Sequence, residues 1–190
     1  MFQAALKSLH GFFSDTIQTL ILAFAIFSVA YFLLIRPFQV SGESMYPTFK
    51  NKEFILTSLI GLRITPPRRG DIIVFQSPNN HERDFIKRVI GLPGEQVSVK
   101  NGKVLINGQV LDEHTYLDPS VQTHQGAFLA EGKTLTIPPS SYFVMGDNRM
   151  ASSDSREWGY LTRKEVIGRV FLVYWPVTKM RWVSNPLIAH

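Results

Sequence analysis

The sequence predicts one N-terminal membrane-spanning helix followed by a mainly antiparallel β domain that carries a small β insertion. Three observations support this fold class. A long apolar run lies near the N-terminus, short segments of strand-like composition fill the rest of the chain, and Asn-Gly, Pro-Pro and Pro-Gly pairs separate them. The segment after residue 36 is long enough to form one compact domain with its own core.

The apolar run is expected to form a transmembrane anchor over residues 17–36, preceded by a short N-terminal segment, residues 1–16. Ser28 is the one polar residue in the central part of this run. At about 1.5 Å per residue, the helix would be roughly 28 Å long, close to the thickness of the hydrocarbon core of a bilayer. Arg36 and Pro37 end the helix, because a guanidinium prefers the membrane interface and Pro cannot continue a helix.

A cleavable secretory signal peptide is the alternative interpretation, because Lys7 precedes an apolar segment near the N-terminus. Such a peptide has a shorter apolar core with small residues after it, whereas Arg36-Pro37-Phe38-Gln39 follow this one. A buried core helix is disfavoured because no polar face recurs along the run. We therefore interpret the segment as an anchor.

After residue 36 the sequence is typical of strands and turns, and no segment shows a convincing helical period. The predicted strands are 71–75, 85–90, 96–99, 104–106, 134–137, 142–145 and 166–175. Asn101-Gly102 joins two of them and predicts a hairpin. Residues 95–138 are expected to form the small inserted β subdomain, to which the sequence assigns no role.

Composition excludes several kinds of chemistry. The chain has no Cys, which rules out disulfides, thiolate catalysis and Cys-ligated zinc. No catalytic-triad or zinc motif contains any of the histidines, which are His10, His81, His114, His124 and His190, so no metal or cofactor is expected. The net charge is +5 with scattered basic residues, which favours anionic lipid headgroups over nucleic acid as partners. The sequence does not indicate an oligomeric state.

Ser44 is the candidate nucleophile, and it lies just beyond the apolar run in the segment 41–48. A serine hydroxyl needs a base within hydrogen-bond reach. Lys87 is the candidate base, because strand alternation places it on one face with Phe85 and Val89, where burial would lower its pKa. The pattern alone also fits a solvated Lys on an edge strand.

A third run, residues 145–159, follows a predicted strand and is rich in Asp, Asn, Ser and Arg. This composition indicates a loop held by hydrogen bonds from side chains to the backbone and by an Asp/Arg pair, although a plain surface loop would look similar.

Taken together, these runs resemble type I signal peptidases. The family has a Ser-Met-x-Pro-Thr box after a membrane anchor, a Lys-Arg-x-x-Gly-x-Pro-Gly box, and a Gly-Asp-Asn-Arg box ending in Ser-x-Asp-Ser-Arg. The corresponding residues here are 44–48, 87–94 and 146–156, and residues 69–75 resemble the box between the first two. The resemblance extends from about residue 17 to about residue 176, and four boxes in this order behind an anchor are highly specific.

The resemblance implies a serine endopeptidase with a Ser/Lys dyad. Ser44 Oγ would attack the scissile carbonyl carbon, Lys87 would act as a neutral general base, and the Ser44 backbone N–H would bind the oxyanion. Ser152 matches the family residue that hydrogen-bonds and orients the Lys. Two structural ion pairs are also implied, namely Arg88 with Asp147 and Asp154 with Arg156.

Two positions depart from the family pattern. Many members have Asp-Asn where this chain has Met150-Ala151, which changes the hydrogen bonding at the tip of that loop. Some members have a Ser two residues before the nucleophile that helps to bind the oxyanion, whereas this chain has Gly42. A second oxyanion donor is therefore left unassigned.

The substrates implied by the resemblance are exported preproteins, cut after small residues in an Ala-x-Ala pattern so that their N-terminal signal peptides are released. The family binds this stretch as an added β-strand, and Met45 is expected to form part of the pocket wall. The implied location is the cytoplasmic membrane of a bacterium, with a single pass and with the catalytic domain, residues 37–190, on the extracytoplasmic side. The charges that flank the span do not decide this orientation.

Membrane lipids are expected to contact an apolar loop and interfacial tryptophans, although ordinary core burial would explain each residue equally well. The residues in question are Leu59, Ile60, Leu62, Trp158, Trp175 and Trp182. Two other functions stay open. A self-cleaving Ser/Lys regulator would need a DNA-binding module, but residues 1–36 contain an apolar span instead. A non-catalytic, membrane-anchored peptide-binding β domain is disfavoured by the presence of both Ser44 and Lys87.

Overall fold

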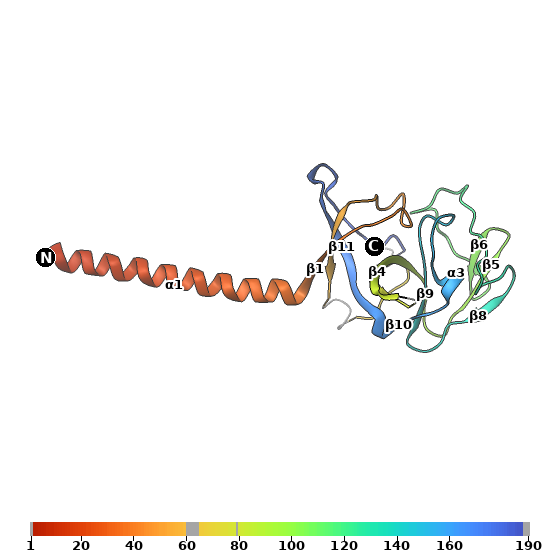
Figure 1. Cartoon of the computed structure of the whole chain (residues 1–190), viewed down its shortest axis with the longest axis horizontal. Helices are drawn as coiled ribbons and strands as arrows, with labels where there is room; N and C mark the ends of the chain where they lie inside the picture. The colour runs from red at the N-terminus through yellow and green to blue at the C-terminus, as the bar shows by residue number, and fades with distance from the viewer. Residues whose placement is uncertain (1, 60–64, 79, 188–190) are drawn as a thin grey trace. The chain divides into compact units, whose positions relative to one another are not determined.

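The computed structural model describes residues 2–59, 65–78 and 80–187. The chain divides into two compact units, Met1–Arg36 and Pro37–His190, which Figure 1 draws together. The predicted fold class is confirmed, because an apolar N-terminal helix precedes a domain of antiparallel sheets. Ile60 and Leu62 of the predicted apolar loop lie outside the described residues.

Helix α1 runs from Phe2 to Leu34, so it begins well before residue 17 and takes in most of the expected N-terminal segment. Its Gly11–Val29 part is long and apolar enough to cross a membrane. The large apolar side chains described in that part are exposed, with Phe24 at 72%. A continuous apolar surface of this kind is stable when lipid or another apolar surface covers it.

Among the described residues, the larger sheet has eight strands in the order β1-β2-β11-β3-β4-β9-β10, with β12 paired to β11. Their bounds are β1 Ile35–Gln39, β2 Phe54–Ser58, β3 Ile72–Ser77, β4 Asn80–Gly91, β9 Ser141–Met145, β10 Leu161–Thr162, β11 Val166–Trp175 and β12 Arg181–Trp182. Every pair whose register is described is antiparallel. The sheet therefore fits the domain class predicted from the period-two pattern.

Strand β4 is held on both sides, because β3 and β9 flank it. On one side Lys87 lies opposite Ile73 of β3, and on the other Arg88 lies opposite Met145 of β9. Consecutive side chains of a strand point to opposite faces of the sheet. The backbone of Lys87 and Arg88 is thus held by the sheet, and their side chains point to opposite faces of it.

The smaller sheet has the order β7-β6-β5-β8. Its strands are β5 Gln96–Lys100, β6 Lys103–Ile106, β7 Gln109–Val110 and β8 Thr134–Thr136. The predicted hairpin at Asn101-Gly102 is present between β5 and β6, and the φ angles there are +51° and +73°. Positive φ at both positions is what a tight I′ turn requires, and Asn-Gly adopts it at low cost.

The two sheets share one hydrophobic cluster. Val97 and Val99 of β5 and Ile137 after β8 pack in it with Ile90 of β4 and Phe143 of β9, and all of these side chains are buried. The larger sheet has further clusters of its own, one of which contains Met45. The smaller sheet is therefore packed onto the strands that carry Lys87, Arg88 and the loop after β9.

Short helices complete the described structure. They are α3 Ser155–Trp158, η1 Arg163–Glu165 and η2 Val177–Lys179. Asp154 caps the N-terminus of α3, because its side chain accepts a hydrogen bond from the Arg156 N–H. This cap lies at the end of the polar run that follows β9.

Candidate active site

Ser44 lies in the turn that follows β1, and the neighbouring backbone fixes this turn. Val40 N–H donates to the Glu53 carbonyl oxygen at 2.8 Å, and Phe49 N–H donates to the Met45 carbonyl oxygen at 2.9 Å. Gly42 has φ +89°, a conformation that side-chain-bearing residues rarely adopt. Glycine at this position therefore lets the chain turn directly before the candidate nucleophile.

Met45 does not lie where the sequence analysis expected it. Its side chain is 1% exposed and packs with Val40, Phe49 and Ile55 in the core, and Met45 is absent from the residues that line the groove described below. The side chain next to Ser44 points the opposite way and anchors the turn in the domain.

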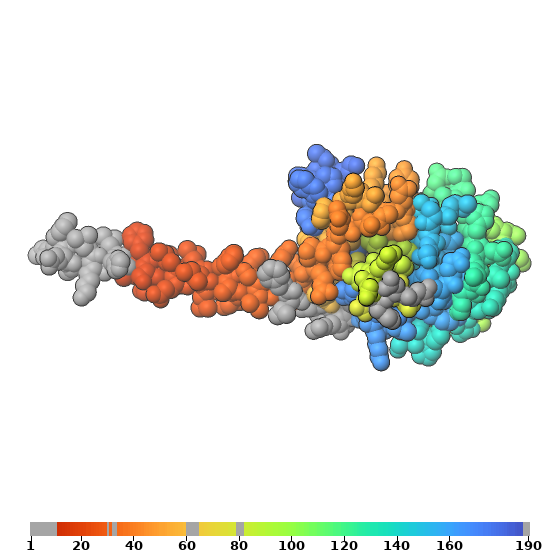
Figure 2. Space-filling model, viewed as in Figure 1, coloured from red at the N-terminus to blue at the C-terminus, as the bar shows by residue number. Residues whose placement is uncertain are grey.

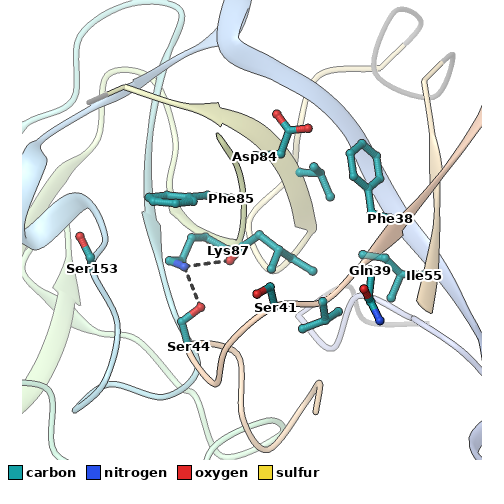
Figure 3. Close-up of a pocket in the computed structure, with 12 residues that line it drawn as sticks. Phe38, Gln39, Ser41, Ser44, Ile55, Asp84, Phe85, Lys87 and Ser153 are labelled. Carbon is teal, nitrogen blue, oxygen red and sulfur yellow. Dashed lines mark hydrogen bonds between the residues drawn. The ribbon is translucent and has the colours of Figure 1, made fainter. Parts of the chain in front are cut away.

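Lys87 brings its amine to the candidate nucleophile. Nζ lies 2.8 Å from Ser44 Oγ and 3.0 Å from the Ile86 carbonyl oxygen, as Figure 3 shows. The Lys87 side chain is almost fully buried at 4% exposure, and its Nζ lies 5.3 Å from the centre of the Phe85 ring. Phe85 and Lys87 thus share surroundings, as strand alternation predicts.

Burial lowers the pKa of Lys87 to about 8, because the charged ammonium loses its water. The carboxylates of Asp154 and Asp147 oppose this shift, and the Arg156 guanidinium adds to it. Roughly one Lys87 amine in ten is then neutral at pH 7. A neutral amine at hydrogen-bond distance from a serine hydroxyl can accept its proton.

A groove of about 220 Å³ opens beside the two side chains. Its lining residues are Phe38, Gln39, Val40, Ser41, Ser44, Ile55, Val74, Asp84, Phe85, Ile86, Lys87 and Ser153. Figure 3 shows that β1 and β4 supply opposite parts of the wall. The groove is mainly apolar and contains the Ser44 hydroxyl, which is the arrangement needed to bind an apolar substrate next to a nucleophile.

Ser152 makes no hydrogen bond to Lys87 among the described residues. Its Oγ is buried and has no hydrogen-bond partner in that part of the chain. The Ile86 carbonyl oxygen accepts the hydrogen bond of the Lys87 amine instead. The expected orienting contact from Ser152 is therefore absent, and the neighbouring Ser153 is the one that lines the groove.

The loop after β9 packs directly against the backbone of Ser44. Asn148 N–H donates to the Ser44 carbonyl oxygen at 3.0 Å. Gly146 lies so close that an added Cβ would overlap both the Ser44 carbonyl oxygen and Ser152 Oγ. The glycine of the Gly-Asp-Asn-Arg box is thus required by the close approach of the two segments.

Two buried ion pairs hold this loop. Arg88 binds Asp147 through Nε at 2.8 Å and Nη2 at 2.7 Å, and both side chains are at most 2% exposed. Arg156 binds Asp154 through Nε and Nη2, both at 2.8 Å. Gly146 N–H also donates to Asp154 Oδ2 at 3.0 Å. Both pairs are bidentate, a geometry that restricts orientation as well as distance.

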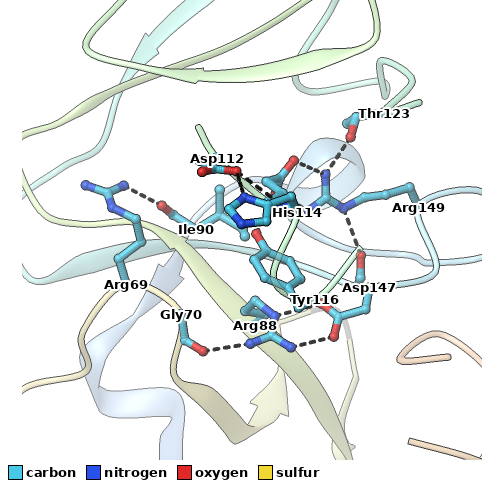
Figure 4. Close-up of polar contacts among 12 residues, drawn as sticks. Arg69, Gly70, Arg88, Ile90, Asp112, His114, Tyr116, Thr123, Asp147 and Arg149 are labelled. Carbon is cyan, nitrogen blue, oxygen red and sulfur yellow. Dashed lines mark hydrogen bonds and ion pairs between the residues drawn. The ribbon is translucent and has the colours of Figure 1, made fainter. Parts of the chain in front are cut away.

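The inserted subdomain contributes a second layer of contacts that no sequence motif predicted, and Figure 4 shows these contacts. Arg149 pairs with Glu113 and donates to Thr123 Oγ1 at 2.5 Å. Tyr116 donates to Glu113 at 2.6 Å and its ring lies 4.1 Å from the Arg88 guanidinium carbon. Burial raises the pKa of Tyr116, so it stays a neutral donor. The insertion therefore supports the loop that contacts Ser44.

The remaining sequence candidates lie away from the groove. His114 and His124 are exposed, and no group of three or more His, Asp or Glu in the described ranges is placed to hold a metal ion. Trp158 is half-buried and packs against Phe75 at the side of a hydrophobic cluster, which favours the burial alternative for this residue. Trp175 and Trp182 are exposed at 53% and 75%.

Comparisons with known proteins place the chain among peptidases. Residues 13–175 match the family model described as signal peptidase, peptidase S26. The chain is 33% identical to signal peptidase IB of Staphylococcus aureus (strain MRSA252) over 183 residues, which cover 90% of this chain and 94% of that protein. It is 41% identical to a signal peptidase I of Leptolyngbya laminosa over 172 residues, which cover 84% of this chain and 80% of that protein. A crystal structure of a signal peptidase I from Enterococcus faecalis V583 is 35% identical, covers 55% of this chain and 97% of that one, and has a TM-score of 0.46.

Proposed function

The chain belongs to the type I signal peptidase family, and on that premise we propose that it cleaves exported preproteins with a Ser44/Lys87 dyad, after small residues of the Ala-x-Ala type. The observation that carries this proposal is the distance of 2.8 Å between Ser44 Oγ and Lys87 Nζ at the wall of an apolar groove. The buried position of Lys87 supports it, because a neutral amine is needed at that point.

In the proposed reaction, Lys87 Nζ accepts the hydroxyl proton of Ser44 while Oγ attacks the scissile carbonyl carbon. The negative charge that develops on the carbonyl oxygen is stabilised by the Ser44 backbone N–H. The protonated Lys87 then donates a proton to the leaving amine, and an acyl ester remains on Ser44. The neutral Lys87 amine next takes a proton from a water molecule, whose oxygen attacks the ester carbonyl carbon. Lys87 then returns this proton to Ser44 Oγ as the bond between Oγ and the acyl carbon breaks, which releases the second product and restores the dyad.

The groove is suited to an extended peptide with small side chains. It lies between residues of β1 and β4, and β1 is an edge strand of the larger sheet. An extended substrate can add to such an edge through main-chain hydrogen bonds. The limited space beside the side chains of Ile55, Val74 and Ile86 favours Ala-like residues close to the bond that is cut.

The other functions considered fit less well. A self-cleaving regulator would need a DNA-binding module, whereas residues 2–34 form one continuous helix. A non-catalytic peptide-binding domain would have no reason to bury a lysine against a serine hydroxyl, because burying an ammonium destabilises the fold.

We expect Ser44→Ala and Lys87→Met each to lower the rate of preprotein cleavage by at least about a thousandfold, because each removes one half of the dyad. Cleavage of a preprotein with an Ala-x-Ala site by detergent-solubilised full-length protein measures this effect. Ser120→Ala and Lys100→Met, in exposed parts of the inserted subdomain, are matched controls that should retain activity. If both dyad variants cleave at the parental rate, the Ser44/Lys87 dyad is contradicted. A peptide-binding role for the domain would then be the better explanation.

The rate of cleavage should depend on pH because the pKa of Lys87 is lowered. The neutral amine is the active form and burial lowers its pKa to about 8, so kcat/KM should be half-maximal near pH 8 and fall about tenfold per pH unit below that. Bound peptide removes further water from the groove, so the midpoint for kcat should lie at a lower pH. Steady-state kinetics between pH 5 and pH 10 test this, and a flat profile from pH 6 to pH 9 would contradict Lys87 as base.

We also propose that the chain is a single-pass protein of a bacterial cytoplasmic membrane, with residues 37–190 outside the cytoplasm and in contact with lipid. The tip of the β11–β12 hairpin, residues 175–182, gathers exposed apolar residues, of which Trp182, Val177 and Met180 are each more than half exposed. Figure 2 shows this tip, in dark blue, standing out from the β domain. Aromatic and basic residues on a projecting hairpin suit a membrane interface.

If this placement holds, proteinase added outside intact spheroplasts will degrade residues 37–190. In vesicles with nitroxide-labelled lipids, a variant that keeps only Trp182 should lose most of its fluorescence, while a variant that keeps only the half-buried Trp158 should not. Protection of the domain in spheroplasts, or equal quenching of both tryptophans, would contradict the placement.

A further inference from the structure

The proposed oxyanion donor belongs to the peptide bond between Glu43 and Ser44. That bond is trans, and in a planar trans peptide the C=O and N–H groups point in opposite directions. Any group that fixes the Glu43 carbonyl oxygen therefore also fixes the direction of the Ser44 N–H.

Two donors hold the Glu43 carbonyl oxygen. Tyr46 N–H donates to it at 3.0 Å within the turn, and Asn148 Nδ2 donates to it at 3.1 Å from the loop after β9. The backbone N–H of the same Asn148 donates to the Ser44 carbonyl oxygen at 3.0 Å. Asn148 thus donates hydrogen bonds to the carbonyl oxygens of both Glu43 and Ser44, which lie on either side of the Ser44 N–H.

The Ser44 N–H itself donates to no protein acceptor within the described ranges, and Ser44 lines the groove. A peptide whose carbonyl oxygen accepts hydrogen bonds becomes more polarised, which makes its N–H a stronger donor. Asn148 is therefore placed both to orient and to strengthen this N–H.

The need for such support is greater here because position 42 offers no side-chain donor. Gly42 has φ +89°, and its own N–H is already bound to Asn51 Oδ1 at 3.1 Å. Stabilisation of the oxyanion then depends strongly on how well the Ser44 N–H is directed.

We propose that the Asn148 side chain is a positioning residue that orients and polarises the Glu43–Ser44 peptide for oxyanion binding. This inference rests on the function proposed above, because it presumes that Ser44 is the nucleophile. The Asn148 amide acts through the peptide and does not touch the reacting atoms.

Asn148→Ala and Asn148→Leu test the proposal, since both remove the side-chain donor but keep the backbone N–H bond to Ser44, and Leu nearly preserves the shape. Asn51→Ala is the matched control. It removes a side-chain hydrogen bond of the same 3.1 Å length from the same turn, but at the Gly42 N–H and not at the oxyanion peptide.

We expect kcat to fall about fivefold in both Asn148 variants, because fivefold corresponds to about 1 kcal/mol, the net contribution of one typical hydrogen bond. KM should change less than about twofold, and the midpoint of the kcat/KM pH profile should stay near 8. The inhibition constant of a peptide aldehyde, whose adduct with Ser44 carries an oxyanion, should rise in parallel with the loss of kcat/KM. Asn51→Ala should stay within about threefold of the parent.

Three results would overturn the inference. These are parental kcat in both Asn148 variants, an equal loss in Asn51→Ala, or a loss of kcat without any weakening of the aldehyde. Thermal unfolding of each variant shows whether it is folded. Ser44→Ala distinguishes a failure of the proposed function from a failure of the proposed role of Asn148. If that variant still cleaves, the proposed function itself fails, whereas an inactive Ser44→Ala beside unchanged Asn148 variants removes only the role of Asn148.

Discussion

The burial of one lysine amine against one serine hydroxyl is the constraint on which the rest of the structure depends. A charged ammonium in this position would lose most of its hydration, so the fold must hold Lys87 in place although burial of its charge is unfavourable. Strand β4 provides the necessary rigidity because β3 and β9 pair with it on both sides. Lys87 thus lies on an interior strand of the larger sheet, whereas Ser44 lies in a turn that other contacts must hold in place.

The ion pairs around the dyad serve that second requirement. Arg88 follows Lys87 in the same strand and reaches Asp147 on the opposite face, so the strand that carries the base also fixes the loop that contacts Ser44. Arg149 and Tyr116 connect this loop to the inserted subdomain. The insertion, for which no sequence motif predicts a role, therefore supports the candidate active site. Breaking one partner of such a buried pair costs more than the pair itself contributes, which makes the arrangement intolerant of change.

Period-two alternation and turn residues were sufficient to predict the β class, the Asn101-Gly102 hairpin and most of the long strands. They missed β2, and they missed strands such as β10 and β12 because two residues form no readable pattern. The motifs identified Ser44 and Lys87 as a pair. A motif does not show which way a side chain points, so Met45 was assigned to the groove although its side chain packs in the core. Contacts such as Glu113 with Arg149 join residues far apart in sequence, and no local pattern predicts them. For the same reason the Asn148 contact with Glu43 emerged only from the structure.

The direct titration of Lys87 tests the central claim without relying on activity. Full-length protein labelled with ¹³C at the lysine Cε positions can be followed by NMR in detergent micelles, and Lys87→Met identifies the Lys87 resonance by its loss. We expect a titration midpoint near pH 8 for Lys87, whereas exposed lysines titrate near 10.4. A Lys87 midpoint above pH 10 would mean that the amine is an ordinary solvated cation, and the proposed role of a neutral base for Ser44 would be contradicted.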